Sequence, residues 1–307
     1  MNAQPFFSII IPTYNRADLI TKTIDSVLGQ TFRDYEIIVV DNKSTDNTVE
    51  ILKPYIESNA ISFYQNEKNH ERAYSRNRGF NLAKGEYVTL LDSDDILYPN
   101  CLVTVYDYIR ENPDCEVFHA KYVMIDLKDN FLKPFYFPSI ENPFKALSKG
   151  NFLANLCIFY KASVIKDVKF DENPIMIGIE DYDFVIRLVG HAGHLGRIDQ
   201  VLGGLREHES RSVHLEEWDK TLRRIDFFLE KHTDPTSKMF AHSKSLKANL
   251  DLYLCSFAAT RYNFATAMKY LFRSFGNYPV ITFSSKFWHH QLVIYKYFIR
   301  YLFKKKR

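Results

Sequence analysis

Short apolar runs alternate with segments of helical apolar spacing through the first hundred residues, and this alternation most constrains the fold. Continuous apolar strands are typical of parallel sheets covered on both faces. Right-handed crossovers wind such a β-α-β order into a parallel sheet whose ligands bind at the carboxyl ends of the strands. We therefore expect an α/β, Rossmann-like fold with a mostly parallel central sheet. Strands are expected at residues 6–11, 36–40, 61–64 and 87–91, and helices at 19–28, 49–56 and 71–83.

The pattern weakens after residue 100 and becomes helical from Trp218 to the end, with breaks near 234–235 and 277–279. Weaker strands are expected at 115–120, 122–125, 155–160 and 201–205, and residues 126–150 as a loop rich in Phe and Pro. We expect a domain boundary near residue 212. Residues 1–212 would form the α/β domain, with a donor half of about 1–100 and an acceptor half of about 100–212, and 213–307 a helical extension with a basic aromatic tail.

The net charge of +3 is concentrated at one end of the chain. Residues 286–307 contain seven Lys and Arg residues and no acid, so the rest of the chain carries −4. This distribution favours an anionic surface as a partner of the tail and argues against nucleic acid binding along the body. The four cysteines are scattered without a C-x-x-C pair, which predicts reduced thiols in a cytoplasmic protein.

Three carboxylates, Asp92, Asp94 and Asp95, stand within four positions directly after the expected strand at 87–91. Carboxylates this close repel one another, and a bound cation would relieve the repulsion. Mg²⁺ or Mn²⁺ suits such a site because it keeps coordination positions open for phosphate oxygens. The alternative is a solvated turn in which Asp95 caps a helix.

Two further polar clusters follow the first and second expected strands, so both should face one crevice. In that crevice, Tyr14 is placed to stack on a base and Asp41 to accept from a base N–H or a ribose hydroxyl. No G-x-G-x-x-G follows a strand and no P-loop motif occurs, which excludes the usual dinucleotide and P-loop sites. The first cluster is Pro12, Thr13, Tyr14, Asn15 and Arg16, and the second is residues 41–46.

Four segments of the sequence closely resemble family 2 of the inverting glycosyltransferases, which have the GT-A fold. They are residues 9–15, 39–46, 76–77 with 85–87, and 91–95. The resemblance spans roughly residues 6–212. It implies a nucleotide-diphosphate-sugar donor, with Asp41 at the base, Arg76 near the base or phosphates, Asp92 near the ribose or metal, and Asp94 on the metal. The implied donor-binding residues are Pro12, Thr13, Tyr14, Asn15, Arg16, Asp41, Ser44, Arg76, Asp92, Ser93 and Arg206.

Residues 178–187 resemble the E-D motif of the same family, whose aspartate is the general base, and this implies the role for Asp181. An inverting transfer needs one carboxylate that takes the acceptor hydroxyl's proton. A diphosphate leaving group is stabilised by cations and needs no acid. The alternative for Glu180 and Asp181 is a pair of first-turn acids that complement a helix dipole.

Residues 205–212 look like the R-x-H-x-x-S element of the family. Arg206 or His208 would then contact the diphosphate or complete the metal shell with Asp94 and Asp92, and an ordinary surface histidine is the alternative. The Q-x-x-R-W motif of processive synthases is absent from the sequence. We therefore expect the transfer of one sugar to each acceptor, which would be a glycan or a lipid-linked precursor.

The stretch 288–303 is rich in aromatic and aliphatic residues, but it is short for a transmembrane span and contains two fixed charges. We expect an interfacial helix that docks the enzyme on the inner face of a membrane without crossing it. A helix that packs on the protein and ends in a solvated tail is the alternative. The expected basic stripe consists of Lys286, His289, Lys296, Arg300 and Lys304.

Two other classes of protein compete with a glycosyltransferase. A haloacid-dehalogenase-like phosphohydrolase also has an apolar strand followed by D-x-D, as in residues 88–94. Its motif belongs on the first strand, whereas here it follows the fourth, so this is the weaker hypothesis. A catalytically inactive nucleotide-sugar-binding protein is the other, and the presence of Asp94 and Asp181 counts against it.

Overall fold

The computed structural model describes residues 4–208 and 217–304, and the chain divides into two compact units. The first unit comprises Met1–Ile140 and Phe152–Arg224, and the second comprises Glu141–Asn151 and Ile225–Arg307. The boundary expected near residue 212 falls outside the described residues.

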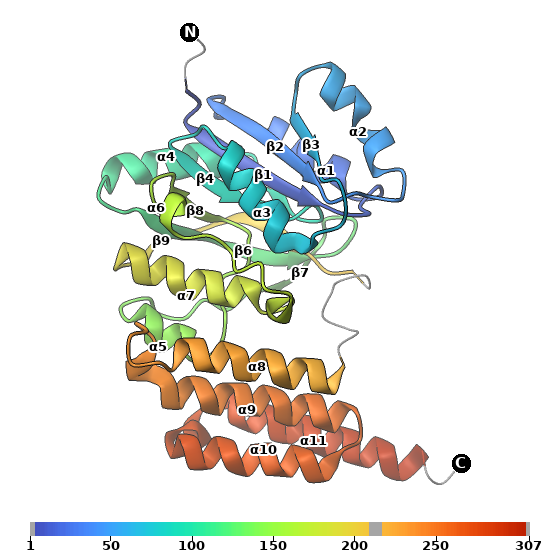
Figure 1. The fold of residues 1–307 in the computed structure, drawn as a ribbon, viewed down its shortest axis with the longest axis vertical. Coiled ribbons are helices and arrows are strands. Elements are labelled where there is room, and N and C mark those ends of the chain that lie inside the picture. The colour runs from blue at the N-terminus through green and yellow to red at the C-terminus, as the bar shows by residue number, and fades with distance from the viewer. Residues whose placement is uncertain (1–3, 209–216, 305–307) are drawn as a thin grey trace. The chain divides into compact units, whose positions relative to one another are not determined.

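The first unit begins with the expected alternation of strands and helices, which builds the parallel half of a nine-stranded sheet (Figure 1). Strand β1 pairs in parallel with both β2 and β4, and β2 pairs in parallel with β3. The carboxyl ends of these strands therefore meet at one edge, as the apolar runs predict. The elements are β1 (Phe7–Thr13), α1 (Ile20–Leu28), β2 (Tyr35–Asp41), α2 (Thr48–Glu57), β3 (Ser62–Gln65), α3 (Glu71–Leu82) and β4 (Tyr87–Leu90).

The rest of the sheet is mixed, with the order β3-β2-β1-β4-β8-β6-β9-β5 and β7 beside β6. Strand β8 is antiparallel to β4 and β6, β9 is parallel to β6, and β5 is antiparallel to β9. The two strands expected at 115–120 and 122–125 are one continuous strand, β6. These elements are β5 (Ile96–Leu97), α4 (Cys101–Glu111), β6 (Val117–Ile125), β7 (Phe131–Pro134), β8 (Ile158–Lys161), α6 (Val164–Asp167), η1 (Pro174–Met176), α7 (Glu180–Ala192) and β9 (Gly196–Arg206).

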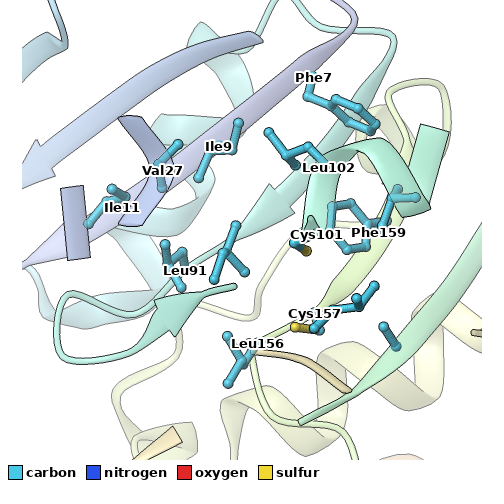
Figure 2. Close-up of a cluster of buried hydrophobic side chains, with 14 of the residues drawn as sticks. Phe7, Ile9, Ile11, Val27, Leu91, Cys101, Leu102, Leu156, Cys157 and Phe159 are labelled. Atoms are coloured by element: carbon cyan, nitrogen blue, oxygen red, sulfur yellow. The ribbon is translucent and has the colours of Figure 1, made fainter. Parts of the chain in front are cut away.

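Side-chain alternation along the buried strands gives the sheet an apolar core on each face. Ile9 and Ile11 of β1 point to the cluster that includes Val27 of α1 and Leu102 of α4 (Figure 2). Ile10 points to the opposite face, where α3 crosses so closely that a Cβ on Gly79 would lie 2.3 Å from Ile10 Cγ2. Gly79 therefore sets the distance between α3 and β1, and with it the position of the side chains on the first turns of α3.

The second unit is helical, as expected for the C-terminal region (Figure 1). Asp251 of α9 accepts hydrogen bonds from Arg273 and from Asn277 of α10, which holds these two helices together. No helix in the described part of the chain is both long and apolar enough to cross a membrane. The elements are α5 (Pro143–Leu147), η3 (Phe240–His242), α9 (Ser243–Thr260), α10 (Phe264–Asn277), η4 (Pro279–Phe283) and α11 (Ser285–Lys304), while α8 (Trp218–His232) begins in the first unit and ends in the second. Because residues 126–150 contain β7 and α5, the expectation of a plain loop there was wrong.

Candidate active site

The loops after β1 and β2 are joined by hydrogen bonds at the carboxyl edge of the sheet. The Asn15 backbone N–H donates to Ser44 Oγ at 2.9 Å, and the Thr45 backbone N–H donates to Asn15 Oδ1 at 2.8 Å. Asn15 has a φ of 51°, a left-handed conformation that asparagine tolerates better than most residues. The structure thus brings together the two polar clusters that the sequence placed at one crevice.

Asp41 ends β2 as a fully buried carboxylate. It accepts hydrogen bonds from the Ser44 backbone N–H at 3.0 Å and from Gln65 Nε2 at 2.9 Å. At the end of neighbouring β1, the Thr13 hydroxyl is buried and has no hydrogen-bond partner among the described residues, while the Tyr14 ring is exposed. A buried hydroxyl without a partner is uncommon unless it is kept for a ligand or a water molecule.

The three carboxylates that follow β4 each turn to a different partner. Asp92 Oδ1 lies 3.0 Å from Arg76 Nη2, and Asp94 Oδ2 lies 3.0 Å from His208 Nε2. Asp95 is buried and accepts a hydrogen bond of 2.9 Å from the Arg206 backbone N–H. The protein's own cations and donors therefore relieve the expected repulsion, and the crowding alone does not require a metal.

Asp94 and His208 form the part of the site that suits a divalent cation. His208 is buried, so the alternative of a surface histidine is wrong. Arg16 Nε lies 3.3 Å from the same Asp94 oxygen. Among residues 4–208 and 217–304, no group of three or more His, Cys, Asp or Glu side chains is placed to hold a metal, and Asp92 is engaged by Arg76. One carboxylate and one imidazole fit a cation that takes its remaining ligands from phosphate and water.

Arg76 connects the carboxylates at the centre of the site. Its guanidinium lies 2.6 Å from Asp181, 3.0 Å from Asp92 and 3.3 Å from Glu180, and its side chain is only 3% exposed. Burial by itself lowers the pKa of Arg76, but the three carboxylates outweigh this effect and raise the pKa above its ordinary value. Arg76 is therefore permanently charged, and it ties the end of β4 to the first turn of α7.

Helices α3 and α7 both begin at this edge of the sheet, and aromatic packing fixes them there. Phe80 lies one turn beyond Arg76 and Phe184 one turn beyond Asp181, and both rings pack on Tyr160 of β8. Phe170 stacks on Phe184 at 4.0 Å between ring centroids. This packing sets the distance between the side chains on the first turns of the two helices.

Glu180 plays a larger part than the sequence suggested. It is buried, receives a hydrogen bond of 2.6 Å from the Gly178 backbone N–H, and lies 3.5 Å from Arg72 as well as beside Arg76. Gly178 has a φ of 93°, which an L side chain rarely adopts, so glycine is needed for this approach. A sequence signal for this role was present. Arg72 and Arg76 lie four residues apart on one helix face, and two cations placed in this way need a buried acid such as Glu180.

Asp181 is the exposed member of the pair, with 31% of its side chain accessible. Partial burial, aided by the charges of Glu180 and Asp92, raises its pKa to about 6, while Arg76 and the side chain of Asn155 oppose the shift. A carboxylate whose pKa lies close to neutral pH is well matched to general-base catalysis. Sequence reasoning missed Asn155 near Asp181, because nothing local connects the loop before β8 to α7, and the Asn155 Nδ2 atom is buried without a hydrogen-bond partner among the described residues.

The shifted pKa predicts an acid limb in the pH profile of kcat/KM. Asp181 can accept a proton only when ionised, so activity should fall about tenfold per pH unit below pH 6 and level off above it. Initial rates between pH 4.5 and 8, with the fold monitored by circular dichroism, measure this. A flat profile down to pH 5 would show that another group is the base.

Arg206 is held by protein groups. Its side chain is buried, lies 2.7 Å from Asp129, and donates a hydrogen bond of 3.1 Å to the Asp94 carbonyl oxygen. These contacts favour a role for Arg206 in supporting the Asp94 backbone. Direct contact of Arg206 with a diphosphate stays a prediction. Ser93 is buried in the same turn, and Pro12 lies in β1 opposite Val40. Residues 209–212 of the expected R-x-H-x-x-S element lie outside the described residues.

The fold is an α/β fold whose sheet is parallel in one half and mixed in the other, with a network of carboxylates, arginines and a histidine at its carboxyl edge. The chain belongs to glycosyl transferase family 2, whose model matches residues 8–169. It is therefore a glycosyltransferase.

Relatives that are similar in sequence are also named as glycosyltransferases. The glycosyltransferase MJ1057 of Methanocaldococcus jannaschii is 33% identical over 206 residues, which cover 65% of this chain and 70% of the relative. The poly(ribitol-phosphate) beta-N-acetylglucosaminyltransferase TarP of Staphylococcus aureus is 42% identical over 110 residues, covering 34% of this chain and 33% of TarP. The chain thus spans most of one relative and about a third of the other.

Two solved structures share the fold. S. aureus TarS 1–349 in complex with UDP-GlcNAc superposes with a TM-score of 0.65 at 22% identity, covering 88% of this chain and 81% of TarS. The mannosyltransferase PcManGT of Pyrobaculum calidifontis, solved with GDP-Man and Mn²⁺, gives 0.59 at 16% identity and covers 99% and 89%. At these identities the likeness establishes the GT-A fold, which confirms the expected fold class.

Proposed function

We propose that the enzyme catalyses the metal-dependent, inverting transfer of one sugar from a nucleotide-diphosphate-sugar donor to an acceptor hydroxyl. One observation carries the proposal. Asp181, with its raised pKa, is joined through Arg76 to Asp92 beside the Asp94–His208 pair, so a proton acceptor lies next to a site suited to a diphosphate. The donors bound by TarS and PcManGT, UDP-GlcNAc and GDP-Man, support this class of donor.

In this reaction Asp181 takes the proton from the acceptor hydroxyl while that oxygen bonds to the anomeric carbon. The bond between the anomeric carbon and the diphosphate oxygen breaks, and its electron pair leaves with the nucleoside diphosphate. Attack on the face opposite the leaving group inverts the anomeric centre. Arg76 keeps Asp181 in position, and Arg16 adds positive charge beside Asp94.

Asp94 and His208 would hold Mg²⁺ or Mn²⁺, and a cation bound there neutralises charge on the departing diphosphate. The Mn²⁺ in the PcManGT complex supports this choice of metal. Asp92 is less suited than Asp94 to be a metal ligand, since its carboxylate pairs with Arg76. At the base end of the donor, Asp41 and the exposed Tyr14 ring supply the acceptor group and the stacking surface, and the unpaired Thr13 hydroxyl lies on the same edge.

The acceptor in this proposal is a lipid-linked or cell-surface glycan precursor, and the enzyme acts as a peripheral protein on the inner face of the membrane. TarP and the poly(ribitol-phosphate) beta-glucosyltransferase of Bacillus spizizenii support a hydroxyl-rich polymer as the kind of acceptor, because their names specify poly(ribitol-phosphate), a polymer of a sugar-alcohol phosphate. Family membership favours this chemistry over phosphohydrolysis. A transfer assay separates an active enzyme from an inactive nucleotide-sugar-binding protein.

A thermal-shift screen of UDP, GDP, dTDP and CMP, each with and without Mn²⁺, tests the donor class. A ligand present at 100 times its Kd adds about 2.7 kcal/mol to stability, a shift of several degrees. We expect at least one diphosphate to raise Tm more with Mn²⁺ than without it. If none of the four nucleotides shifts Tm in either condition, the proposed donor site is wrong.

A further inference from the structure

Large apolar side chains are unusually exposed on the last helices of the second unit. Five of them have at least 58% of their surface accessible, whereas side chains of this type are normally buried. They come from three consecutive elements, α10, η4 and α11, and so do not reflect one frayed helix end. The five are Phe272, Phe283, Trp288, Leu292 and Tyr295.

These side chains follow helical spacing on the faces that point away from the packed interior. On α10, exposed Met268, Phe272 and Phe275 alternate with buried Tyr270 and Leu271. On α11, exposed Trp288, Leu292, Tyr295 and Leu302 recur at intervals of three, four or seven, while Phe287 is buried. Each helix therefore has a second apolar face in addition to the one that packs.

Element η4 brings the start of α11 beside the exposed side chains of the connection. Trp288 Nε1 donates a hydrogen bond of 2.9 Å to the carbonyl oxygen of Thr282, the residue before Phe283, and so ties the indole to the backbone of η4. Phe283 is 89% exposed, and Val280 one turn earlier is exposed as well. Apolar patches of this kind on a protein surface mark sites of interaction.

The charged residues of the segment that carries this surface are all basic, although Arg273 among them is paired with Asp251 of α9. Residues 252–307 contain ten Lys and Arg residues and no Asp or Glu. Exposed Lys269, Lys296 and Arg300 flank the apolar side chains, whereas Lys286, expected in the basic stripe, donates to the Lys149 carbonyl oxygen. The Lys304 side chain and residues 305–307 lie outside what the structure describes.

We propose that α10, η4 and α11 together form a docking surface for an anionic lipid bilayer, with the exposed aromatic residues inserted at the interface and the basic residues over the headgroups. Trp and Tyr are favoured at that depth, and each basic residue near an anionic surface adds to the electrostatic attraction. A second copy of the chain is disfavoured as the occupant, because a symmetric contact would bring together two segments that carry ten basic and no acidic residues each. The proposal rests on the proposed function only for its biological purpose, delivery of the active site to a lipid-linked acceptor.

Flotation of the full chain with vesicles tests the surface. Wild type should float with phosphatidylcholine vesicles that contain phosphatidylglycerol, and less so in high salt. The triple variant Phe272→Ser, Phe283→Ser, Trp288→Ser should bind these vesicles at least about 10-fold more weakly than wild type. Lys296→Gln with Arg300→Gln should weaken binding and reduce its dependence on salt.

The matched control is Phe131→Ser with Tyr136→Ser, which removes two exposed aromatic rings from the first unit and should float like wild type. All variants should keep the same Tm and the same shift with nucleotide, so that loss of lipid binding is separable from failure of the fold or of the donor site. The proposal is overturned if wild type ignores anionic vesicles at low salt, or if the triple variant binds as wild type does. It is equally overturned if light scattering shows that the same side chains hold two copies together and vesicles do not separate them.

Discussion

Replacing Asp181 by Asn will lower the turnover number by about 10²-fold or more while leaving donor affinity nearly unchanged. Asparagine keeps the shape of the side chain and can still interact with Arg76, but it cannot accept a proton. Steady-state rates with saturating donor, together with calorimetric binding of the nucleoside diphosphate, measure the two effects. The same variant should lose the acid limb near pH 6 from any residual activity.

Asp183→Asn provides the matched control for this change. Asp183 is buried in the same helix and bound to Arg187 at 2.6 Å, so its loss should lower stability with little effect on turnover. Near-normal turnover in Asp181→Asn would place the base elsewhere. Glu180 is a poor substitute in the structure, because its carboxylate is buried against Arg72 and Arg76.

Asp94→Ala is expected to abolish the Mn²⁺-dependent part of nucleotide binding without unfolding the protein. The change removes the carboxylate of the proposed Asp94–His208 pair and leaves only the imidazole of that pair for a cation. Asp92 and Asp95 keep their separate partners, so the turn after β4 should hold its shape at a modest cost in stability. Thermal-shift titrations of UDP and GDP with and without Mn²⁺ measure the loss.

Asp126→Ala is the control for the metal prediction. Asp126 is a half-buried residue whose carboxylate accepts hydrogen bonds from residues 128 and 130 of its own loop. This variant should retain the full Mn²⁺ effect. Were Asp94→Ala to bind nucleotide with the same dependence on Mn²⁺ as wild type, the cation would have to sit elsewhere.

The parallel half of the fold was predictable because its signals are local. Strands β1, β2 and β4 are buried and mostly apolar, and helices α1 and α2 have their own apolar spacing, whereas the short strand β3 is only partly buried. The mixed half depends on pairings that no local window contains. Strand β5 has only two residues, Ile96 and Leu97, and forms because they pair with β9. Strand β7 is exposed, so its sequence resembles a loop, and it is a strand only through its pairing with β6.

The location of the site was also predictable, but its internal connections were not. Parallel strands place their carboxyl ends together, so the clusters after β1, β2 and β4 had to converge. Which carboxylate meets which partner depends on residues more than a hundred positions apart, as with Arg76 and Asp181 or Asp94 and His208. Spacing alone therefore suggested one shared metal cluster of Asp92 and Asp94, where the structure has two separate networks.

The configuration of the product decides whether the enzyme inverts the anomeric centre. A donor identified by the nucleotide screen is incubated with the enzyme and an acceptor, and the anomeric proton of the transferred sugar is followed by NMR from the first turnovers. A single carboxylate base at Asp181, with no covalent sugar intermediate, predicts a linkage of configuration opposite to that in the donor. A product that retains the donor's configuration would contradict the account.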